Sequence, residues 1–417
     1  MANKLIVLML DGISADYFAT CRARLPHLAA LAERGFEIQN LRSEVCGTSL
    51  PGRTSMMTGE RADVSGVYGN MIWGGEQFRY ATPYDVRVPT LAGRARAAGR
   101  SVAVVGFGML RPEDADLFMM PWWAGLFIQR ARDNAPVEAG EGWMKVFQHP
   151  GNRERFAQIV GTADLPTEWP SVESASGADR MALSMMADRR TVDWVSALAT
   201  SDDSPDVIIA ETLITDSVQH YTGYKSEYAH WSVAYADMLV GVVIERLRAA
   251  GKLDSYNIAV MSDHGHSPID TAIHPSVIIP DATFQSEGSI LHVVPKDAAE
   301  LAQITEALAP YGVTPYTNTH IPTDHRDQIA AFVAPDRTSF EHDPNKEIDG
   351  PTGTPAALSS HGLRPGSPGD DRFAVFVGPD VKPGVLERAE AAQVAPTLAQ
   401  LAGIALDSYP MPPAFTQ

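Results

Sequence analysis

Four short apolar runs, each rich in β-branched residues, limit the folds that this sequence can adopt. They are Leu5–Leu10, Val102–Val105, Val207–Ala210 and Ile258–Met261. Continuous runs of this length are typical of strands that are covered on both faces. Between these runs, apolar residues recur at the spacing of a helix, for example at Leu239, Val243 and Leu247. The alternation predicts an α/β fold, with a mostly parallel central sheet and helices on both of its faces.

Glycines follow several predicted helices, at Gly35, Gly99 and Gly251. Because glycine readily adopts the left-handed conformation that ends many helices, we expect a helix to stop at each of these positions.

Two regions interrupt the alternation and are predicted to form a cap over one end of the sheet. Residues 110–175 contain four of the seven Trp residues, and residues 266–355 mix strand candidates with long loops. The predicted organisation is catalytic core at 1–109, cap insertion at 110–175, core at 176–265, second cap insertion at 266–355 and core at 356–417.

Charge and composition exclude several classes of protein. The 417 residues include 33 Lys and Arg against 51 Asp and Glu, for a formal charge of −18. This balance argues against proteins that grip nucleic-acid backbones or anionic membranes, because both tasks need clustered positive charge. Cys21 and Cys46 are the two cysteines, so no disulfide framework is expected. Leu5–Leu10 is too short for the apolar part of a signal peptide, and a cytoplasmic protein is therefore expected.

Polar residues follow two of the predicted strands. Asp11 closes the first run, and Asp263 and His264 follow the run that ends at Met261. In open α/β sheets, ligands gather at the carboxyl ends of the strands, and Zn²⁺ accepts this mixture of oxygen and nitrogen donors. An Asp-Gly turn and a helix cap with a chance histidine remain alternative interpretations.

Further candidates are weak when taken alone. Asp216 and His220 share a face if a helical turn begins there, and His361 lies in a loop before the apolar run Phe373–Val377. Ser49 lies two residues before Pro51, where a helix N-terminus would favour an anion. A capping Asp with a surface His, and an ordinary Ser N-cap, are the plain structural alternatives.

Taken in order, these motifs resemble the alkaline phosphatase superfamily, especially its nucleotide pyrophosphatase/phosphodiesterase and phosphonoacetate hydrolase branches. The matching elements are Asp11-Gly12, Ser49 before Pro51, Thr58-Gly59, Gly69-Asn70, Asp216 to His220, Asp263-His264-Gly265 and His361-Gly362. They cover the core but not the two insertions.

The resemblance implies two metal sites. One would consist of Asp216, His220 and His361, and the other of Asp11, Asp263, His264 and the Ser49 oxygen. The resemblance also implies that Ser49 attacks phosphorus to form a covalent phospho-enzyme, while Asn70 donates a hydrogen bond to a substrate oxygen. Two divalent ions of this kind stabilise in-line displacement. The donors favour Zn²⁺, although Mn²⁺ or Fe also fits them.

The expected substrate is a phosphodiester, as a small anionic ester. No stable nucleic-acid or membrane partner is expected, and the sequence does not determine the oligomeric state. Phosphomonoesterases of the superfamily hold the extra phosphate charge with Arg or Lys, for which Arg53 is the nearest candidate. Phosphonoacetate hydrolase is an alternative, but Gly106–Met109 stands where lysines are expected to bind its substrate. That apolar segment suits an organic ester group better.

A further alternative is a sulfatase in which Ser49 is oxidised to formylglycine. The three histidines of the predicted metal sites count against this alternative. A binding protein that kept this fold without its chemistry is the alternative from another class. Trp122 and Trp123, with Phe127, could stack on a base or an aryl group, or could simply pack within the cap. His266 and His274 are close enough in sequence to reach the mouth of the site, but neither is assigned a role.

Overall fold

An eight-stranded sheet forms the centre of the molecule, in the order β19-β2-β18-β8-β1-β7-β5-β6. The computed structural model describes residues 4–124, 140–149, 153–160, 177–342, 348 and 350–416. The strands of this sheet are β1 (Lys4–Leu10), β2 (Phe36–Arg42), β5 (Val102–Val105), β6 (Leu117–Met119), β7 (Val207–Thr212), β8 (Tyr256–Met261), β18 (Arg372–Val377) and β19 (Gly384–Glu390). Only β18 runs antiparallel to its neighbours, β2 and β8. The prediction of a mostly parallel sheet is confirmed, and the four apolar runs lie in β1, β5, β7 and β8.

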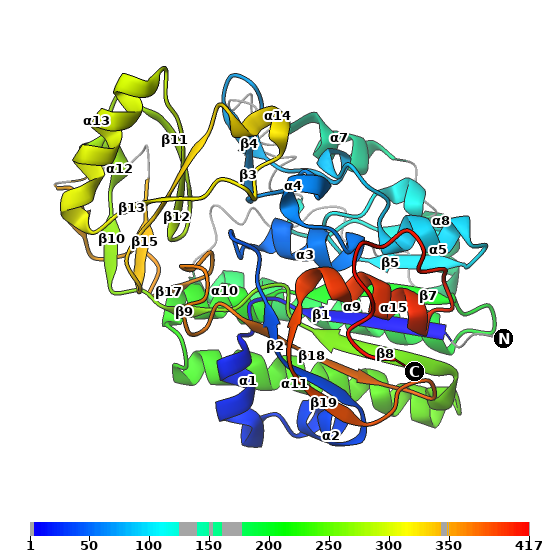
Figure 1. Cartoon of the computed structure of the whole chain (residues 1–417). Helices are drawn as coiled ribbons and strands as arrows, with labels where there is room; N and C mark the ends of the chain where they lie inside the picture. Colours follow the sequence, from blue (N-terminus) through cyan, green and yellow to red (C-terminus); the bar gives the residue numbers. More distant parts are fainter. Residues whose placement is uncertain are drawn as a thin grey trace.

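Helices cover both faces of the sheet, as Figure 1 shows. Alternate residues of β1 enter different cores: Leu5 lies in one and Ile6 in the other, and both are fully buried. The first core includes residues of α3 (Ser49–Thr58), α5 (Leu91–Ala97) and α15 (Val394–Leu401). The second includes residues of α1 (Ala15–Cys21), α2 (Pro26–Arg34), α9 (Gly177–Thr200) and α11 (Glu227–Ala249). This arrangement explains why the strand sequences are apolar without alternation.

The chain between β8 and β18 builds a smaller sheet in the order β11-β12-β14-β13. Its strands are β11 (Thr283–Glu287), β12 (Ile290–Val294), β13 (Thr314–Tyr316) and β14 (Ala330–Val333). Helix α13 (Ala298–Leu308) packs on this sheet, with Ile304 and Leu308 in contact with a core that includes Leu291 and Phe332. We call this part the cap sheet. It lies inside the second predicted cap insertion, whose boundaries stay a prediction. Much of the first insertion lies outside the described residues.

Shorter elements complete the described chain. The strands are β3 (Met71–Trp73), β4 (Phe78–Tyr80), β9 (Ser267–Pro268), β10 (Thr271–Ile273), β15 (Thr338–Phe340), β16 (Thr352–Gly353) and β17 (Ser359–Ser360). The helices are α4 (Ala62–Ser65), α7 (Gly140–Gln148), α8 (Arg153–Val160), α10 (Ile214–Thr222), α12 (Pro275–Ile278) and α14 (Thr323–Arg326). Among the described helices, none combines the length and the hydropathy that a membrane span needs.

Two of the three predicted glycine stops have the expected conformation, with φ of +76° at Gly99 and +67° at Gly251. Gly35 does not, since it ends α2 with φ −120° and ψ −154°. The reason for glycine there is space, because a Cβ would lie 2.0 Å from the carbonyl oxygen of Phe376 on β18.

Candidate metal centre and nucleophile

Two neighbouring strand ends bring the first group of acidic and histidine side chains together. Strand β1 pairs in parallel with β8, so Asp11 and Asp263 leave the sheet side by side. The Nε2 atom of His264 lies 3.0 Å from Asp11 Oδ1 and 3.8 Å from Asp263 Oδ2. His264 Nδ1 donates to the carbonyl oxygen of Gly265 at 2.8 Å, which leaves Nε2 as the ring atom available to a metal ion.

The backbone after Asp11 turns sharply to make this approach possible. Gly12 has φ +71°, and its N–H donates to Asp263 Oδ1 at 3.2 Å. A Cβ at Gly12 would lie 3.0 Å from the Cβ of Asp216, which is tighter than most real Cβ contacts. The Asp-Gly turn is therefore present, and it also places a carboxylate in the site.

Helix α10 contributes a second pair. Asp216 and His220 lie one turn apart, with His220 Nε2 3.2 Å from Asp216 Oδ1. Two residues of the same helix, Thr215 and Gln219, donate to the carbonyl oxygens of Asp11 and Gly12 and so fix the helix to the first strand end. Asp216 is inside the first turn and is not the N-cap, which is Leu213.

The β17 loop supplies His361. Its Nε2 lies 3.7 Å from Asp216 Oδ1, and its ring centroid lies 4.1 Å from that of His264. Ser359, two residues earlier, accepts a hydrogen bond from His220 Nδ1 at 3.0 Å through its carbonyl oxygen. This bond directs His220 Nε2 toward Asp216, as an outer hydrogen bond commonly orients a metal-bound histidine.

His266 is the member of the site to which the sequence analysis assigned no role. The side chain is fully buried, and its Nε2 lies 3.3 Å from Asp216 Oδ1. Neither ring nitrogen makes a hydrogen bond within the described part of the chain. The available signal was its position two residues after His264, since alternate residues of an extended segment share a side. His274 instead donates from Nδ1 to the carbonyl oxygen of Gly350 in the cap region.

Three overlapping groups of side chains could each hold a metal ion, with ligand atoms within 4.8 Å of one another. They are Asp11 with Asp263 and His264, Asp216 with His264 and His361, and Asp216 with His220 and His266. The buried oxygens Asp11 Oδ1, Asp216 Oδ1 and Asp263 Oδ2 make no hydrogen bond among the described residues. Close N···O approaches without hydrogen-bond geometry are what donors to a shared cation show, so these residues fit a metal centre.

Burial and like charge shape the electrostatics of the centre. Burial, together with repulsion from Asp263, raises the pKa of Asp11 to about 7, although Arg53 opposes this. Burial alone would lower the pKa of His264, but the carboxylates of Asp263, Asp11 and Asp216 outweigh it and raise the pKa to about 9. Divalent cations would offset this crowding of carboxylates.

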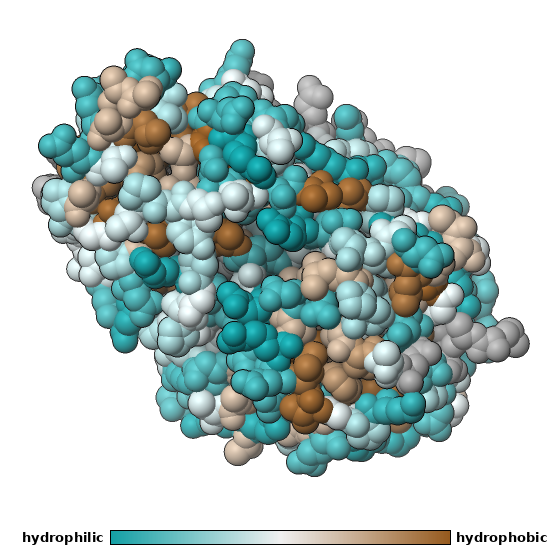
Figure 2. Space-filling view, in the orientation of Figure 1, coloured by the Kyte–Doolittle hydropathy of each residue, from teal (hydrophilic) through white to brown (hydrophobic). Residues whose placement is uncertain are grey.

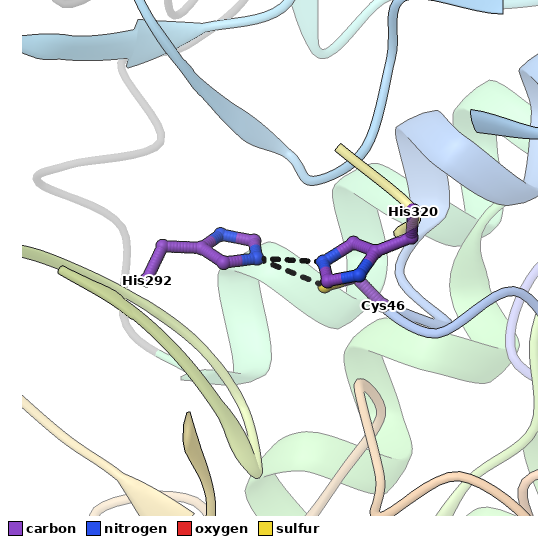
Figure 3. A group of neighbouring side chains, drawn as sticks. All are labelled: Cys46, His292 and His320. Carbon is purple, nitrogen blue, oxygen red and sulfur yellow. Dashed lines mark hydrogen bonds between the residues drawn. The ribbon is translucent and has the colours of Figure 1, made fainter. Parts of the chain in front are cut away.

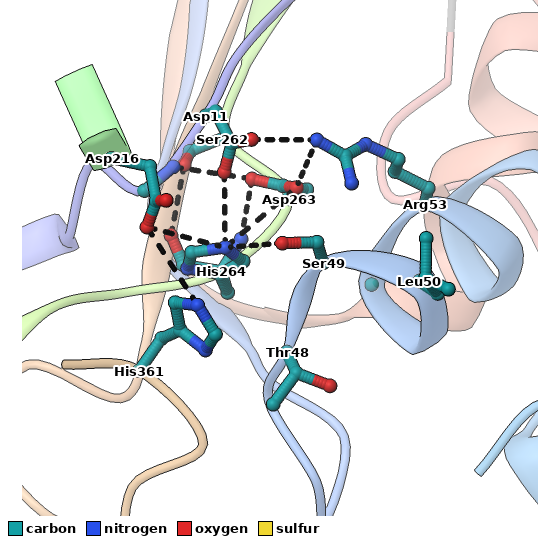
Figure 4. Close-up of polar contacts among 12 residues, drawn as sticks. Asp11, Thr48, Ser49, Leu50, Arg53, Asp216, Ser262, Asp263, His264 and His361 are labelled. Carbon is teal, nitrogen blue, oxygen red and sulfur yellow. Dashed lines mark hydrogen bonds and ion pairs between the residues drawn. The ribbon is translucent and has the colours of Figure 1, made fainter. Parts of the chain in front are cut away.

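Ser49 lies at the edge of this group, as Figure 4 shows. Its Oγ lies 3.1 Å from His264 Nε2, and it is the first residue of α3, after the N-cap Thr48. The Leu50 N–H donates to Asn70 Oδ1 at 2.8 Å. That bond orients the Asn70 amide at the same helix end and leaves its NH₂ group as the donor side.

Arg53 does not have the role that the sequence analysis considered for it. The side chain is 2% exposed, so it is neither a surface charge nor a group that faces substrate. Its Nη2 lies 2.6 Å from Asp11 Oδ2 and 3.3 Å from Asp263 Oδ2, and its Nε lies 2.8 Å from Glu211 Oε2. The guanidinium therefore holds two candidate ligands in place from behind the site.

The apolar segment Gly106–Met109 is also placed differently from the expectation. Phe107 and Met109 are buried in the first core, so neither offers a surface to an ester group. Trp123 donates from Nε1 to Glu211 Oε1 at 2.8 Å and packs edge-on against Trp143. Of the two interpretations for this aromatic group, packing fits Trp123, while Phe127 lies outside the described residues.

Comparison with known proteins agrees with this geometry. Residues 5–362 match the family "type I phosphodiesterase / nucleotide pyrophosphatase". The solved structure of human ectonucleotide pyrophosphatase/phosphodiesterase 5 is similar, with a TM-score of 0.65 and 16% identity over 98% of this chain and 96% of that one. An inactive variant of the murine counterpart in complex with AMP has the same score and identity over 97% and 96% of the two chains. The chain therefore belongs to the type I phosphodiesterase/nucleotide pyrophosphatase family of the alkaline phosphatase superfamily, and it is a phosphoric ester hydrolase.

Proposed function

We propose that this protein is a two-metal phosphodiesterase in which Ser49 forms a covalent phospho-enzyme. The observation that carries the proposal is the position of Ser49 Oγ, 3.1 Å from His264 Nε2, at a helix N-terminus beside three candidate ligand groups. The half-buried hydroxyl is adjacent to the candidate cation-binding residues without being sealed in the core, as nucleophilic catalysis requires.

Two divalent ions, with Zn²⁺ as the first choice, would be held by two sets of residues. One set is Asp216, His220 and His361, joined by His266, and the other is Asp11, Asp263, His264 and the Ser49 oxygen. Bound ions of this kind supply positive charge against the phosphoryl oxygens and lower the pKa of a neighbouring hydroxyl.

The chain's own groups account for the bonds that change. The Ser49 hydroxyl loses its proton to solvent and its Oγ attacks phosphorus and forms an O–P bond, while the ester O–P bond breaks and the alcohol leaves with a proton from solvent. Water then attacks the phosphorus of this intermediate, a phosphodiester of Ser49 that keeps the second ester group. The Ser49 O–P bond breaks, Ser49 Oγ regains a proton and a phosphomonoester is released. The Asn70 amide donates to a non-bridging oxygen, where charge develops in both steps.

Preference for a diester is supported by the place of Arg53. A monoester brings a second negative charge, and enzymes that accept it commonly neutralise that charge with a cationic side chain. Arg53, the candidate from sequence, is occupied by Asp11, Glu211 and Asp263.

Small soluble esters are the proposed substrate class. The formal charge of −18 disfavours long polyanions, which need clustered positive charge for binding. Figure 2 shows one face of the molecule as mostly hydrophilic, with apolar residues in small separate groups. Since a murine relative was solved in complex with AMP, a nucleotide diester belongs among the first substrates to test.

The test is a substrate screen with matched variants. The wild-type protein, loaded with Zn²⁺, is assayed on aryl mono- and diesters of phosphate, an aryl sulfate, phosphonoacetate, a nucleotide diester and long DNA. The Ser49→Ala variant is expected to lose diesterase activity by about 10³-fold or more. Ser255→Ala is the control, because Ser255 is an exposed residue just before β8, at the opposite end of that strand from Asp263.

The outcomes separate the alternatives. Activity on the phosphodiesters that chelator abolishes supports the proposal, as does a covalent phosphodiester adduct on Ser49 after rapid quenching. Preference for phosphonoacetate or for the sulfate would replace the proposal with a phosphonatase or a sulfatase. Full diesterase activity in Ser49→Ala would remove Ser49 as nucleophile.

A further inference from the structure

A second group of buried metal-binding side chains lies outside the centre described above. Cys46, His292 and His320 bring one sulfur and two ring nitrogens within 4.8 Å of one another. None of the three belongs to the catalytic groups. They come from separate segments: the loop before Ser49, strand β12 of the cap sheet, and the loop between β13 and α14.

The imidazoles of His292 and His320 point toward each other, with Cys46 beside them, as Figure 3 shows. The two Nε2 atoms are 2.9 Å apart, and Cys46 Sγ is 3.8 Å from His292 Nε2. At Zn–N and Zn–S distances of about 2.05 and 2.3 Å, the edges of a tetrahedral site are about 3.4 and 3.6 Å. Movements of about 0.5 Å or less would therefore bring both contacts to these values.

The chemical state of these groups suits a metal ion. Burial lowers the pKa of His320 to about 4 and that of His292 well below its ordinary value, so both rings are neutral and offer lone pairs. Burial, followed by the nearby carboxyl groups of Glu287, Asp370 and Glu44, raises the pKa of the Cys46 thiol well above its ordinary value, so the thiol keeps its proton without a cation. Binding of a metal ion would release that proton to solvent.

We propose that Cys46, His292 and His320 form a zinc site, separate from the catalytic centre, that joins the loop before Ser49 to the cap sheet. One sulfur with two imidazoles is a donor set that Zn²⁺ accepts, with the fourth position left to water. The ion is a structural link: it fixes a residue three positions before the nucleophile to two segments of the second insertion.

Cobalt provides a probe that reports this site alone. Protein stripped with chelator is titrated with Co²⁺, and the near-ultraviolet sulfur-to-cobalt charge-transfer band is followed. The catalytic groups contain no cysteine, so they cannot produce this band. We expect the titration to end at the intensity of one cobalt–thiolate bond per chain in the wild-type protein, in Ser49→Ala and in the control Cys21→Ser, and no band in Cys46→Ser.

Zinc content gives a second measurement that does not depend on activity. After equilibration with Zn²⁺ and gel filtration, Cys46→Ser and His320→Gln are each expected to bind one ion fewer than wild type, whatever the number in the catalytic centre. His320→Gln serves where Cys46→Ser fails to fold, as judged by circular dichroism. A wild-type protein without the band, a band that survives in Cys46→Ser, or equal zinc content in the folded variants would overturn the proposal and leave the proposed function untouched.

Discussion

Replacement of Arg53 by Met separates a positioning role from a substrate-binding role. The guanidinium contacts three buried carboxylates at 2.6, 2.8 and 3.3 Å, and the side chain is 2% exposed. Removal of one partner from a buried ion pair leaves the other charge uncompensated, at a cost of about 3–5 kcal/mol. We therefore expect Arg53→Met to lower the free energy of unfolding by about that amount, measured by urea denaturation in the presence of chelator.

A double variant tests whether the cost comes from the charge that is left behind. Glu211 also accepts from the Gly108 N–H at Oε2 (3.1 Å) and from Trp123 Nε1 at Oε1 (2.8 Å), so glutamine removes the charge and keeps one of these two bonds through its single carbonyl oxygen. Addition of Glu211→Gln to Arg53→Met is expected to recover about 1–3 kcal/mol. Arg53→Lys should fall between wild type and Arg53→Met, because lysine keeps the charge but not the fork that spans three carboxylates.

Kinetics then distinguish the two roles of Arg53. If the guanidinium only positions Asp11 and Asp263, Arg53→Met lowers kcat/KM for an aryl monoester and an aryl diester by the same factor. If it instead faces the extra charge of a monoester, the loss is confined to the monoester. A selective loss, or a variant as stable as wild type, would refute the reasoning from burial and distance.

Three further changes test other parts of the structure. His266→Ala should weaken binding of one metal ion by about 10–100-fold in chelator competition, whereas the control His274→Ala should not; equal affinities would exclude His266 from the centre. Glu287→Gln should lower kcat by about tenfold, because Glu287 accepts from the N–H groups of Asn70 and Met71 at 2.8 and 2.7 Å and glutamine cannot accept both. The control is Glu306→Gln, at an exposed position. An unchanged kcat in Glu287→Gln would count against this role. Burial raises the pKa of Asp370 from 3.8 to about 8. Between about pH 4 and 8 the folded protein therefore keeps a proton that the unfolded chain has lost. The stability from Asp370 is accordingly lost as the pH rises through this window to 8. The free energy of unfolding of wild type minus that of Asp370→Asn should thus fall by up to about 1.4 kcal/mol per pH unit in this window, and a flat difference would contradict the raised pKa.

Sequence patterns predicted the sheet, and they picked out most of the residues that the structure brings together in the candidate centre, because both depend on short-range signals. A buried strand requires an apolar run, and a residue after a parallel strand reaches the ligand edge of the sheet whatever follows it. Asp11, Asp263 and His264 obey this rule, and Asp216 with His220 obeys the spacing of a helical turn. These assignments needed no knowledge of distant contacts.

The misplaced residues depend on long-range packing instead. Arg53 occupies the first turns of a helix, where a charge is usually exposed, and only the approach of Asp11, Glu211 and Asp263 accounts for its burial. Phe107 and Met109 follow a strand end, which is where ligands bind, but the first core takes up both side chains. No local pattern distinguishes these outcomes, since the partners are separated from them by tens to hundreds of residues.

The cap sheet and the catalytic centre are joined by direct contacts, which has a consequence for specificity. Glu287, the last residue of β11, accepts from the backbone of Asn70 and from the Thr48 hydroxyl, next to Ser49. On the other side, a Cβ at Gly288 would lie 2.4 Å from the carbonyl oxygen of His361, and one at Gly362 would lie 2.4 Å from that of Glu287. The β11–β12 turn therefore cannot shift without moving a group beside Ser49, the amide of Asn70 or the candidate ligand His361. The cap sheet thus also constrains the geometry of the proposed nucleophile and of one candidate metal ligand, so changes in the cap sheet are expected to alter kcat as well as KM.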